Sequence, residues 1–380
     1  MIPFIDLKTQ YKRLENEIKS KIQTVFEHGH FIMGPEIEEV EQKLSQFVGV
    51  KHAITCSSGT DALLMPLMAW GIGPGDAVLT TPFTFIATAE VIQLLGAVPV
   101  FVDIDEKTFN INPIKLREQI EKLLENGKLR PKAIIPVDLF GLPADYEEIN
   151  TLARDFDILV LEDAAQSFGA EYKGQKTCSL THAAATSFFP AKPLGCYGDG
   201  GAVFTNDDEL AEQLRSIRIH GQGSNKYENI RTGLNARFDT LQAAALLPKL
   251  DIFPEEIVMR QKVAEKYSSG LKNKVKVPYV PKDRISVWAQ YSVLAHDNEE
   301  RAAMQKWLGE NGIPTAIYYP IPLHLQKAFS HLEYRPGSFP IAEQISKKIF
   351  SLPMHPYLTD EQSTKIIDIL LSYKLTYNQE

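Results

Sequence analysis

One lysine of the 380-residue sequence stands in surroundings that would change its chemistry. Lys192 lies in the segment SFFPAKP at 187–193, between aromatic residues and prolines. A lysine amine that is removed from water has a lowered pKa and becomes a usable nucleophile near neutral pH. Most lysines are solvated surface charges, so the apolar flanks favour a nucleophile here but do not establish it alone.

A carboxylate at the end of a predicted strand is the second candidate. Asp163 follows the apolar run 158–161, and alternation along a strand sends Glu162 to the opposite face. Ligands of an open parallel sheet bind beyond the carboxyl ends of its strands, where Asp163 could bind a metal, orient a base or hold a heterocyclic nitrogen protonated. Capping of the next helix explains the residue equally well. The lack of a second carboxylate or histidine at ligand spacing disfavours the metal.

Two further clusters could hold a flat, phosphorylated ligand. The segment SSGTD at 57–61 places Gly59 and small hydroxyl residues between a predicted strand and a predicted helix. Unpaired N–H groups and the positive end of the helix dipole suit a phosphate there, although capping by Ser58 or Thr60 is an equal alternative. Phe85 follows another predicted strand and could stack on a ligand ring, whereas a core aromatic is the more common role.

Together these four features fit one cofactor. A phosphate cradle, a strand-end carboxylate, a stacking aromatic and a lysine of the buried type are the parts that pyridoxal phosphate requires. The lysine would bond the cofactor aldehyde, and the acid would keep the pyridine nitrogen protonated so that the ring can accept electrons. The glycine clusters at 198–201 and 221–223 do not have the spacing of a dinucleotide site.

The predicted elements place these residues at one edge of a sheet. Short apolar or β-branched runs alternate with helical patterns, with strands predicted at 52–56, 77–80, 98–102, 133–137, 158–161, 184–189 and 202–205. Such alternation is typical of a mostly parallel sheet with helices on both faces. Two amphipathic helices precede it, with apolar stripes along 11–25 and 37–47.

Two domains are expected from the length, at roughly 100–200 residues per domain. Helical patterns cover 240–250 and 254–271, and a smaller α/β unit follows with elements at 287–294, 300–311 and 316–319. The predicted fold class is therefore α/β. We expect a large cofactor-binding domain at 1–255 and a small C-terminal domain at 256–380.

Composition disfavours several other classes of protein. A formal net charge of −8 without a basic block argues against a nucleic-acid partner. The apolar stretch 91–102 is too short and too interrupted to cross a membrane. The three cysteines lack the pattern of a disulfide framework or a zinc site, and the first residues do not resemble a signal peptide. We therefore expect a cytoplasmic protein that needs no metal.

Several motifs in fixed order make the chain similar to a known family. They are FIDL at 4–7, SGTDAL at 58–63, EDAAQ at 162–166, SFFPAK at 187–192 and GDGG at 198–201. This series resembles the DegT-type nucleotide-sugar aminotransferases, which are fold-type I pyridoxal phosphate enzymes. The resemblance is collinear over nearly the whole chain and implies that the protein is an enzyme of this type.

The resemblance implies a role for each residue that matches a family motif. Lys192 would be the Schiff-base lysine and Asp163 the partner of the pyridine nitrogen. Gln166 would lie against the cofactor ring near its phenolic oxygen, and Phe85 would stack on the other face. The phosphate would be held by Gly59, Thr60 and Ser187, and by Asn235 of a partner subunit. An obligate homodimer, with active sites at its interface, is therefore implied.

Within the family, the segments 187–208, 239–244 and 351–358 favour the members that aminate UDP-2-acetamido-2-deoxy-3-oxo-glucuronate with L-glutamate for surface polysaccharides. Arg237 is the candidate for the sugar carboxylate, because a guanidinium binds a carboxylate bidentately, and an interface salt bridge is its equal alternative. Tyr318 and Tyr319 stand where such members have His-Tyr near the sugar. The alternatives are amination at position 4 of a dTDP- or UDP-4-oxo-6-deoxy sugar, or a non-catalytic regulatory protein of the same fold.

Overall fold

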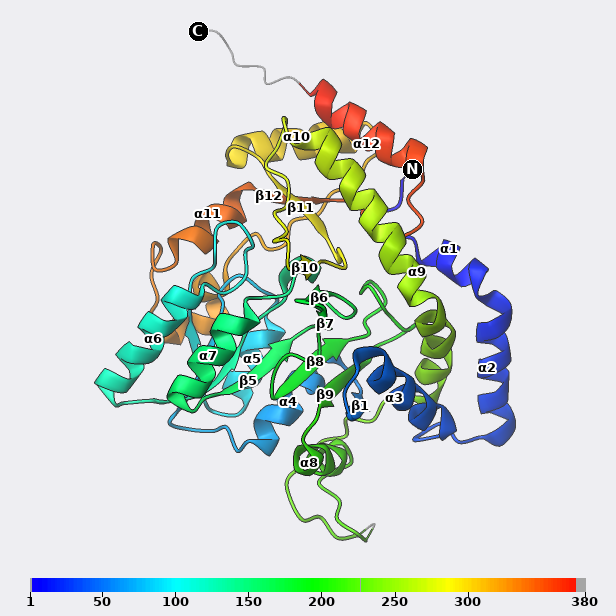
Figure 1. The fold of residues 1–380 in the computed structure, drawn as a ribbon, viewed down its shortest axis with the longest axis vertical. Helices are drawn as coiled ribbons and strands as arrows, with labels where there is room; N and C mark the ends of the chain where they lie inside the picture. The colour runs from blue at the N-terminus through cyan, green and yellow to red at the C-terminus, as the bar shows by residue number, and fades with distance from the viewer. Residues whose placement is uncertain (1, 226, 374–380) are drawn as a thin grey trace.

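A seven-stranded sheet forms the centre of the structure, a computed structural model that describes residues 2–225 and 227–373 (Figure 1). The strand order is β1-β9-β8-β5-β4-β2-β3. Within this sheet β9 runs antiparallel to both of its neighbours, and the other adjacent pairs are parallel. The strands are β1 (His52–Cys56), β2 (Asp76–Thr80), β3 (Val98–Phe101), β4 (Arg130–Ile135), β5 (Leu159–Asp163), β8 (Ala183–Ser187) and β9 (Gly201–Thr205). The predicted α/β class and its mostly parallel sheet are confirmed.

Helices cover both faces of this sheet, as the alternating pattern predicts. The helices α4 (Gly59–Ala69), α5 (Ala87–Leu94) and α8 (Asp208–Arg218) share one hydrophobic core with one face. The opposite face packs on α3 (Pro35–Val48), α6 (Pro113–Asn126), α7 (Tyr146–Phe156) and the first half of α9 (Thr240–Leu271). Because both faces are covered, strands such as β2 and β8 are buried along their whole length.

The long helix α9 leads from the sheet to the second unit (Figure 1). The sequence patterns predict two helical segments, 240–250 and 254–271, but the structure has one helix of 32 residues that contains Pro248 and Pro254. Packing along its length outweighs the local cost of these prolines. The helix runs through the predicted domain boundary at residues 255 and 256, and that boundary stays a prediction.

The second unit is built on a two-stranded antiparallel sheet of β11 (Tyr291–Leu294) and β12 (Ile349–Leu352). Its core includes the second half of α9, α10 (Asn298–Glu310), α12 (Asp360–Ser372) and Ile2 from the start of the chain. The helix α11 (Pro340–Lys348) leads into β12. The segment 316–319, expected as a regular element, makes one bridge between Ala316 and Ser351 instead. Nearby prolines remove the donors that a longer ladder would need.

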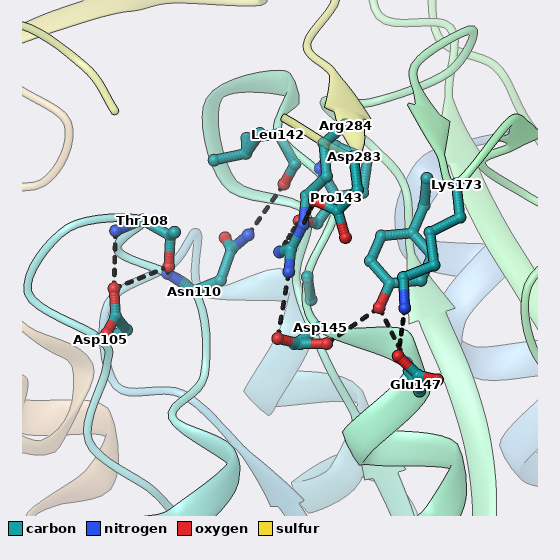
Figure 2. A network of polar contacts seen from close by, with 12 residues as sticks. Asp105, Thr108, Asn110, Leu142, Pro143, Asp145, Glu147, Lys173, Asp283 and Arg284 are labelled. Atoms are coloured by element: carbon teal, nitrogen blue, oxygen red, sulfur yellow. Dashed lines mark hydrogen bonds and ion pairs between the residues drawn. The ribbon is translucent and has the colours of Figure 1, made fainter. Parts of the chain in front are cut away.

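The remaining elements connect these two units. The helices α1 (Leu7–Arg13) and α2 (Glu15–His28) are the first two helices of the chain. In a small three-stranded sheet, β6 (Glu171–Tyr172) lies between β7 (Gln175–Lys176) and β10 (Arg284–Ile285). Arg284 donates to the Pro143 carbonyl oxygen at 2.9 Å and pairs with Asp145 at 3.1 Å (Figure 2). Across residues 2–225 and 227–373, no helix combines the length and apolar character of a membrane span.

Candidate active site

The N-terminus of α4 is pressed against the carboxyl end of β8. A Cβ atom on Gly59 would lie 2.6 Å from the Cβ of Ser187, closer than real side chains approach. On the other side, a Cβ atom on Gly201 would lie 2.4 Å from the Ser58 carbonyl oxygen. Glycine is therefore required at both positions. The approach brings Gly59, Thr60 and Ser187 together at a helix N-terminus, which fits a phosphate group.

Asp163 ends β5 and is buried at the same edge of the sheet. Its carboxylate accepts hydrogen bonds from the Thr88 hydroxyl at 2.8 Å and the Ala165 N–H at 3.2 Å. Burial raises the pKa of Asp163, while the Thr88 hydrogen bond and the charge of Lys192 oppose that shift. Glu162 accepts from the Cys178 N–H at 2.7 Å instead, so the neighbouring carboxyl groups take different partners, as strand alternation predicts.

Lys192 lies in the loop that follows β8. Burial lowers the pKa of its amine, and the nearby carboxylate of Asp163 opposes the shift. The loop is compact, because a Cβ atom on Gly195 would lie 2.6 Å from the Phe189 carbonyl oxygen. The fully buried Lys249 of α9 donates to the Gly195 carbonyl oxygen at 2.7 Å and so anchors the loop. No sequence motif marks Lys249 as part of the site.

Gln166 connects three separate parts of the chain. Its Oε1 accepts from the Phe140 N–H at 2.7 Å, and its Nε2 donates to the Tyr319 hydroxyl at 3.1 Å. Tyr319 therefore reaches the sheet edge from beyond α10, and burial raises the pKa of its hydroxyl. The ring of the neighbouring Tyr318 lies 6.5 Å from that of Phe4, centroid to centroid. The structure thus brings the chain start and the 318–319 segment toward the predicted site.

Of the other predicted site residues, Phe85 and Asn235 are exposed and Arg237 is half-buried. The Phe85 side chain is 56% exposed, and Asn235 is exposed. Ala236, next to Asn235, accepts from the Ser57 N–H at 3.0 Å, which places this segment beside the loop before α4. The Nε atom of Arg237 is buried and finds no hydrogen-bond partner within residues 2–225 and 227–373.

The donor set suits an organic cofactor. A helix N-terminus without a Cβ, a buried carboxylate and a part-buried lysine are the groups that pyridoxal phosphate needs for its phosphate, ring nitrogen and aldehyde. In the described part of the chain, no group of three or more His, Cys, Asp or Glu side chains is arranged to hold a metal ion.

Comparison with known proteins agrees with this geometry. The DegT/DnrJ/EryC1/StrS aminotransferase family model matches residues 12–371. The chain belongs to this family. Enzymes of the family use pyridoxal phosphate, so the predicted cofactor and the predicted transaminase activity are confirmed.

Individual relatives cover nearly the full length. The chain is 52% identical over 368 residues to the UDP-2-acetamido-2-deoxy-3-oxo-D-glucuronate aminotransferase of Pseudomonas aeruginosa, covering 97% of this chain and 98% of that protein. It is 40% identical over 374 residues to the dTDP-3-amino-3,6-dideoxy-alpha-D-galactopyranose transaminase of Aneurinibacillus thermoaerophilus, covering 98% and 99%. A crystal structure of a DegT DnrJ EryC1 StrS aminotransferase from Brucella abortus superposes with a TM-score of 0.95 at 49% identity, covering 98% and 99%.

The close approach of α4 to β8 gives a prediction about cofactor affinity. Gly59→Ala is expected to weaken pyridoxal phosphate binding by about tenfold or more, because the new methyl group must push the helix N-terminus away from Ser187. An absorbance titration of the folded variant measures this. Gly309→Ala in α10 is the matched control, since a Cβ there meets nothing within 4 Å. Equal affinity of both variants would contradict the assignment of this cradle to the phosphate.

Proposed function

We propose that this aminotransferase transfers the amino group of L-glutamate to the 3-ketone of UDP-2-acetamido-2-deoxy-3-oxo-glucuronate for surface-polysaccharide synthesis. The observation that carries the proposal is the 52% identity, over 97% of the chain, to the Pseudomonas aeruginosa enzyme named for that substrate. The Aneurinibacillus thermoaerophilus relative is also named for a 3-amino sugar, which favours position 3 over position 4. The three cysteines are free and buried, which fits the cytoplasm as the proposed location.

The residues of the site would divide the work of the two half-reactions. Pyridoxal phosphate supplies the aldehyde that takes up the amino group and the ring that accepts electrons. Lys192 would hold the cofactor and then take the proton from the α-carbon of glutamate, which its lowered pKa favours. The Asp163 carboxylate, oriented by Thr88, would keep a proton on the ring nitrogen. Gln166, fixed by Phe140 and Tyr319, would flank the phenolic oxygen of the ring.

The visible absorbance of the purified protein tests this reaction. Glutamate is expected to bleach the cofactor band, and after its removal the UDP-linked 3-oxo uronate is expected to restore it. Lys192→Ala is expected to abolish turnover, because the amine that would move the proton is removed. Restoration by a 4-oxo-6-deoxy sugar in place of the uronate would refute the proposed substrate. Absence of any band after addition of pyridoxal phosphate would refute the role of the site.

Arg237 is the proposed partner of the sugar carboxylate. Its Nε atom is buried and has no hydrogen-bond partner in the described residues, which supports binding of an acceptor such as a substrate carboxylate. Asp239, two residues later, bridges to Ile32, so the segment is anchored. A guanidinium in this position would recognise a uronate and discriminate against a neutral sugar.

Arg237→Met is therefore expected to raise KM for the uronate by about 10–100-fold while kcat changes less, because a charged hydrogen bond to the substrate is lost. Steady-state kinetics with the uronate and with the corresponding neutral 3-oxo sugar provide the measurement. Arg335→Met at an exposed position serves as the control. An equal loss toward both sugars would indicate the alternative role, an interface salt bridge.

We also propose a homodimer in which Asn235 completes the phosphate site of the partner. The side chains of Phe31, Ile32 and Met33 are 44%, 52% and 40% exposed, and Phe26 packs beside Phe31. Such a contiguous apolar surface favours burial against a second copy.

Mixing two inactive or weakened variants tests this arrangement. Lys192→Ala chains still carry Asn235, and Asn235→Ala chains still carry Lys192. A hybrid dimer therefore contains one complete site of two, and equal mixing makes half of the dimers hybrids. Mixing after mild dissociation is expected to restore activity toward about a quarter of that of the unchanged enzyme. Activity that merely equals the sum of the separate variants would contradict a shared site.

A further inference from the structure

A buried pair of carboxyl groups lies directly behind the active-site edge of the sheet. Asp138 and Glu162 are both 0% exposed, and each carboxyl group lies within reach of the other. Glu162 is the first residue of the EDAAQ motif, but neither acidic side chain is assigned a contact with the cofactor. An acidic pair without a cation must be stabilised by hydrogen bonds or by a shared proton.

The Asp138 carboxylate is nearly saturated with donors. Its Oδ1 accepts from the Ala144 N–H at 2.8 Å and from the Tyr146 hydroxyl at 2.7 Å, and its Oδ2 accepts from the Ser167 hydroxyl at 2.7 Å. A carboxylate has about four lone-pair sites, so Oδ2 has room for one more donor. These contacts are those of an ionised acid.

Glu162 has the opposite pattern. Its Oε1 accepts from the Cys178 N–H at 2.7 Å, whereas its Oε2 is buried and meets no donor within residues 2–225 and 227–373. A charge on this oxygen would lack a hydrogen-bond donor, and a proton on the carboxyl group of Glu162 could be donated to the neighbouring carboxylate of Asp138. Glu162 therefore lacks a hydrogen-bond partner on one oxygen, and Asp138 can accept one more hydrogen bond.

We infer that Glu162 is uncharged and donates its carboxyl proton to the Asp138 carboxylate. This pair thereby positions the loop at 138–142, whose backbone contacts Asp163 and Gln166. Burial raises the pKa of Asp138 to about 6, and it raises the pKa of Glu162 well above its usual value. Near neutral pH the pair then keeps one proton, on Glu162. Tyr146 and Cys178 are the other titratable groups that face it.

The loop carries this arrangement to the site. The Asp138 N–H donates to the Asp163 carbonyl oxygen at 3.1 Å, and the Phe140 N–H donates to Gln166 Oε1 at 2.7 Å. Asn110 holds the loop from the other side, because it accepts from the Leu139 N–H at 3.0 Å. It also donates to the Leu142 carbonyl oxygen at 2.9 Å (Figure 2). Asp138 and Glu162 are thus positioning residues for Asp163 and Gln166. This part of the inference rests on the cofactor placement proposed above.

Infrared spectroscopy of the full-length protein tests where the proton lies. A protonated carboxyl group absorbs above the amide I band, in a region where ionised carboxylates do not absorb. Near neutral pH the unchanged protein is expected to show such a band, and Glu162→Gln is expected to lose it. Spectra that do not differ in this region would show an ionised Glu162 and overturn the inference.

A pair of amide substitutions tests the direction of the hydrogen bond. Glutamine at 162 keeps an oxygen for the Cys178 N–H and an N–H for Asp138, so Glu162→Gln is expected to melt close to the unchanged protein. Asparagine at 138 turns an N–H group toward other donors, so Asp138→Asn is expected to melt far lower. The reverse order would place the proton on Asp138 and overturn the inference. If Asp138→Asn does not fold, the infrared comparison decides.

Retention of pyridoxal phosphate during dialysis tests the positioning role. Asp138→Asn is expected to weaken retention by about tenfold or more, and the milder Ser167→Ala to weaken it in the same direction. Glu162→Gln, the conservative variant, is expected to retain the cofactor. Folded Asp138→Asn and Ser167→Ala proteins with unchanged retention would overturn the positioning role. Failure of the proposed sugar reaction would appear instead as missing amino transfer in the unchanged enzyme, which none of these readouts measures.

Discussion

The buried carboxylate of Asp163 is the charge that the surrounding structure has to stabilise. An isolated carboxylate in the interior is costly unless donors and positive charge surround it. The Thr88 hydroxyl from α5, the Ala165 N–H and the amine of Lys192 meet this need from three segments of the chain. Each of them is fixed in turn by a helix, a strand end or a tight loop. The architecture around β5 can therefore be understood as support for one ionised group.

Close backbone approach is the second constraint, and it makes the site compact. The helix α4 can contact β8 because Gly59 has no side chain, and the loop around Lys192 can close because Gly195 has none. The buried Lys249 then holds that loop through its Gly195 contact. Tyr319 arrives from the second unit and completes the contacts of Gln166. A site assembled in this way depends on the packing of both units, not on the sheet alone.

Local patterns in the sequence were sufficient to predict the strands that position the site. The seven strands of the main sheet were predicted within a few residues, because fully buried parallel strands are continuous apolar runs. The motif residues of the site stand at strand and helix ends, where such patterns change. The roles of the site residues remain predictions, including those of Arg237 and Asn235, because their partners would be a cofactor, a substrate and a second subunit.

The supporting residues could not be predicted, for a physical reason. Thr88 lies 75 residues from Asp163 in the chain, and Phe140 acts on Gln166 through its backbone N–H, which every non-proline residue possesses. Lys249 looks like a surface lysine of an amphipathic helix until the helix is known to be covered. Likewise, Pro248 and Pro254 suggested a break in α9, and only tertiary packing shows why the helix continues. These features arise from long-range contacts that no local pattern records.

The two adjacent acids of β5 show how strand geometry places neighbouring carboxyl groups in different surroundings. Alternation turns Asp163 toward donors and the site, and Glu162 toward the interior, where one of its oxygens lacks a donor in the described chain. Asp138 contacts both, through its N–H to the Asp163 carbonyl oxygen and through its carboxylate near Glu162. A shift of β5 by one residue would turn Glu162 toward the site and Asp163 toward the interior. The register of β5 is therefore a condition for chemistry as well as for packing.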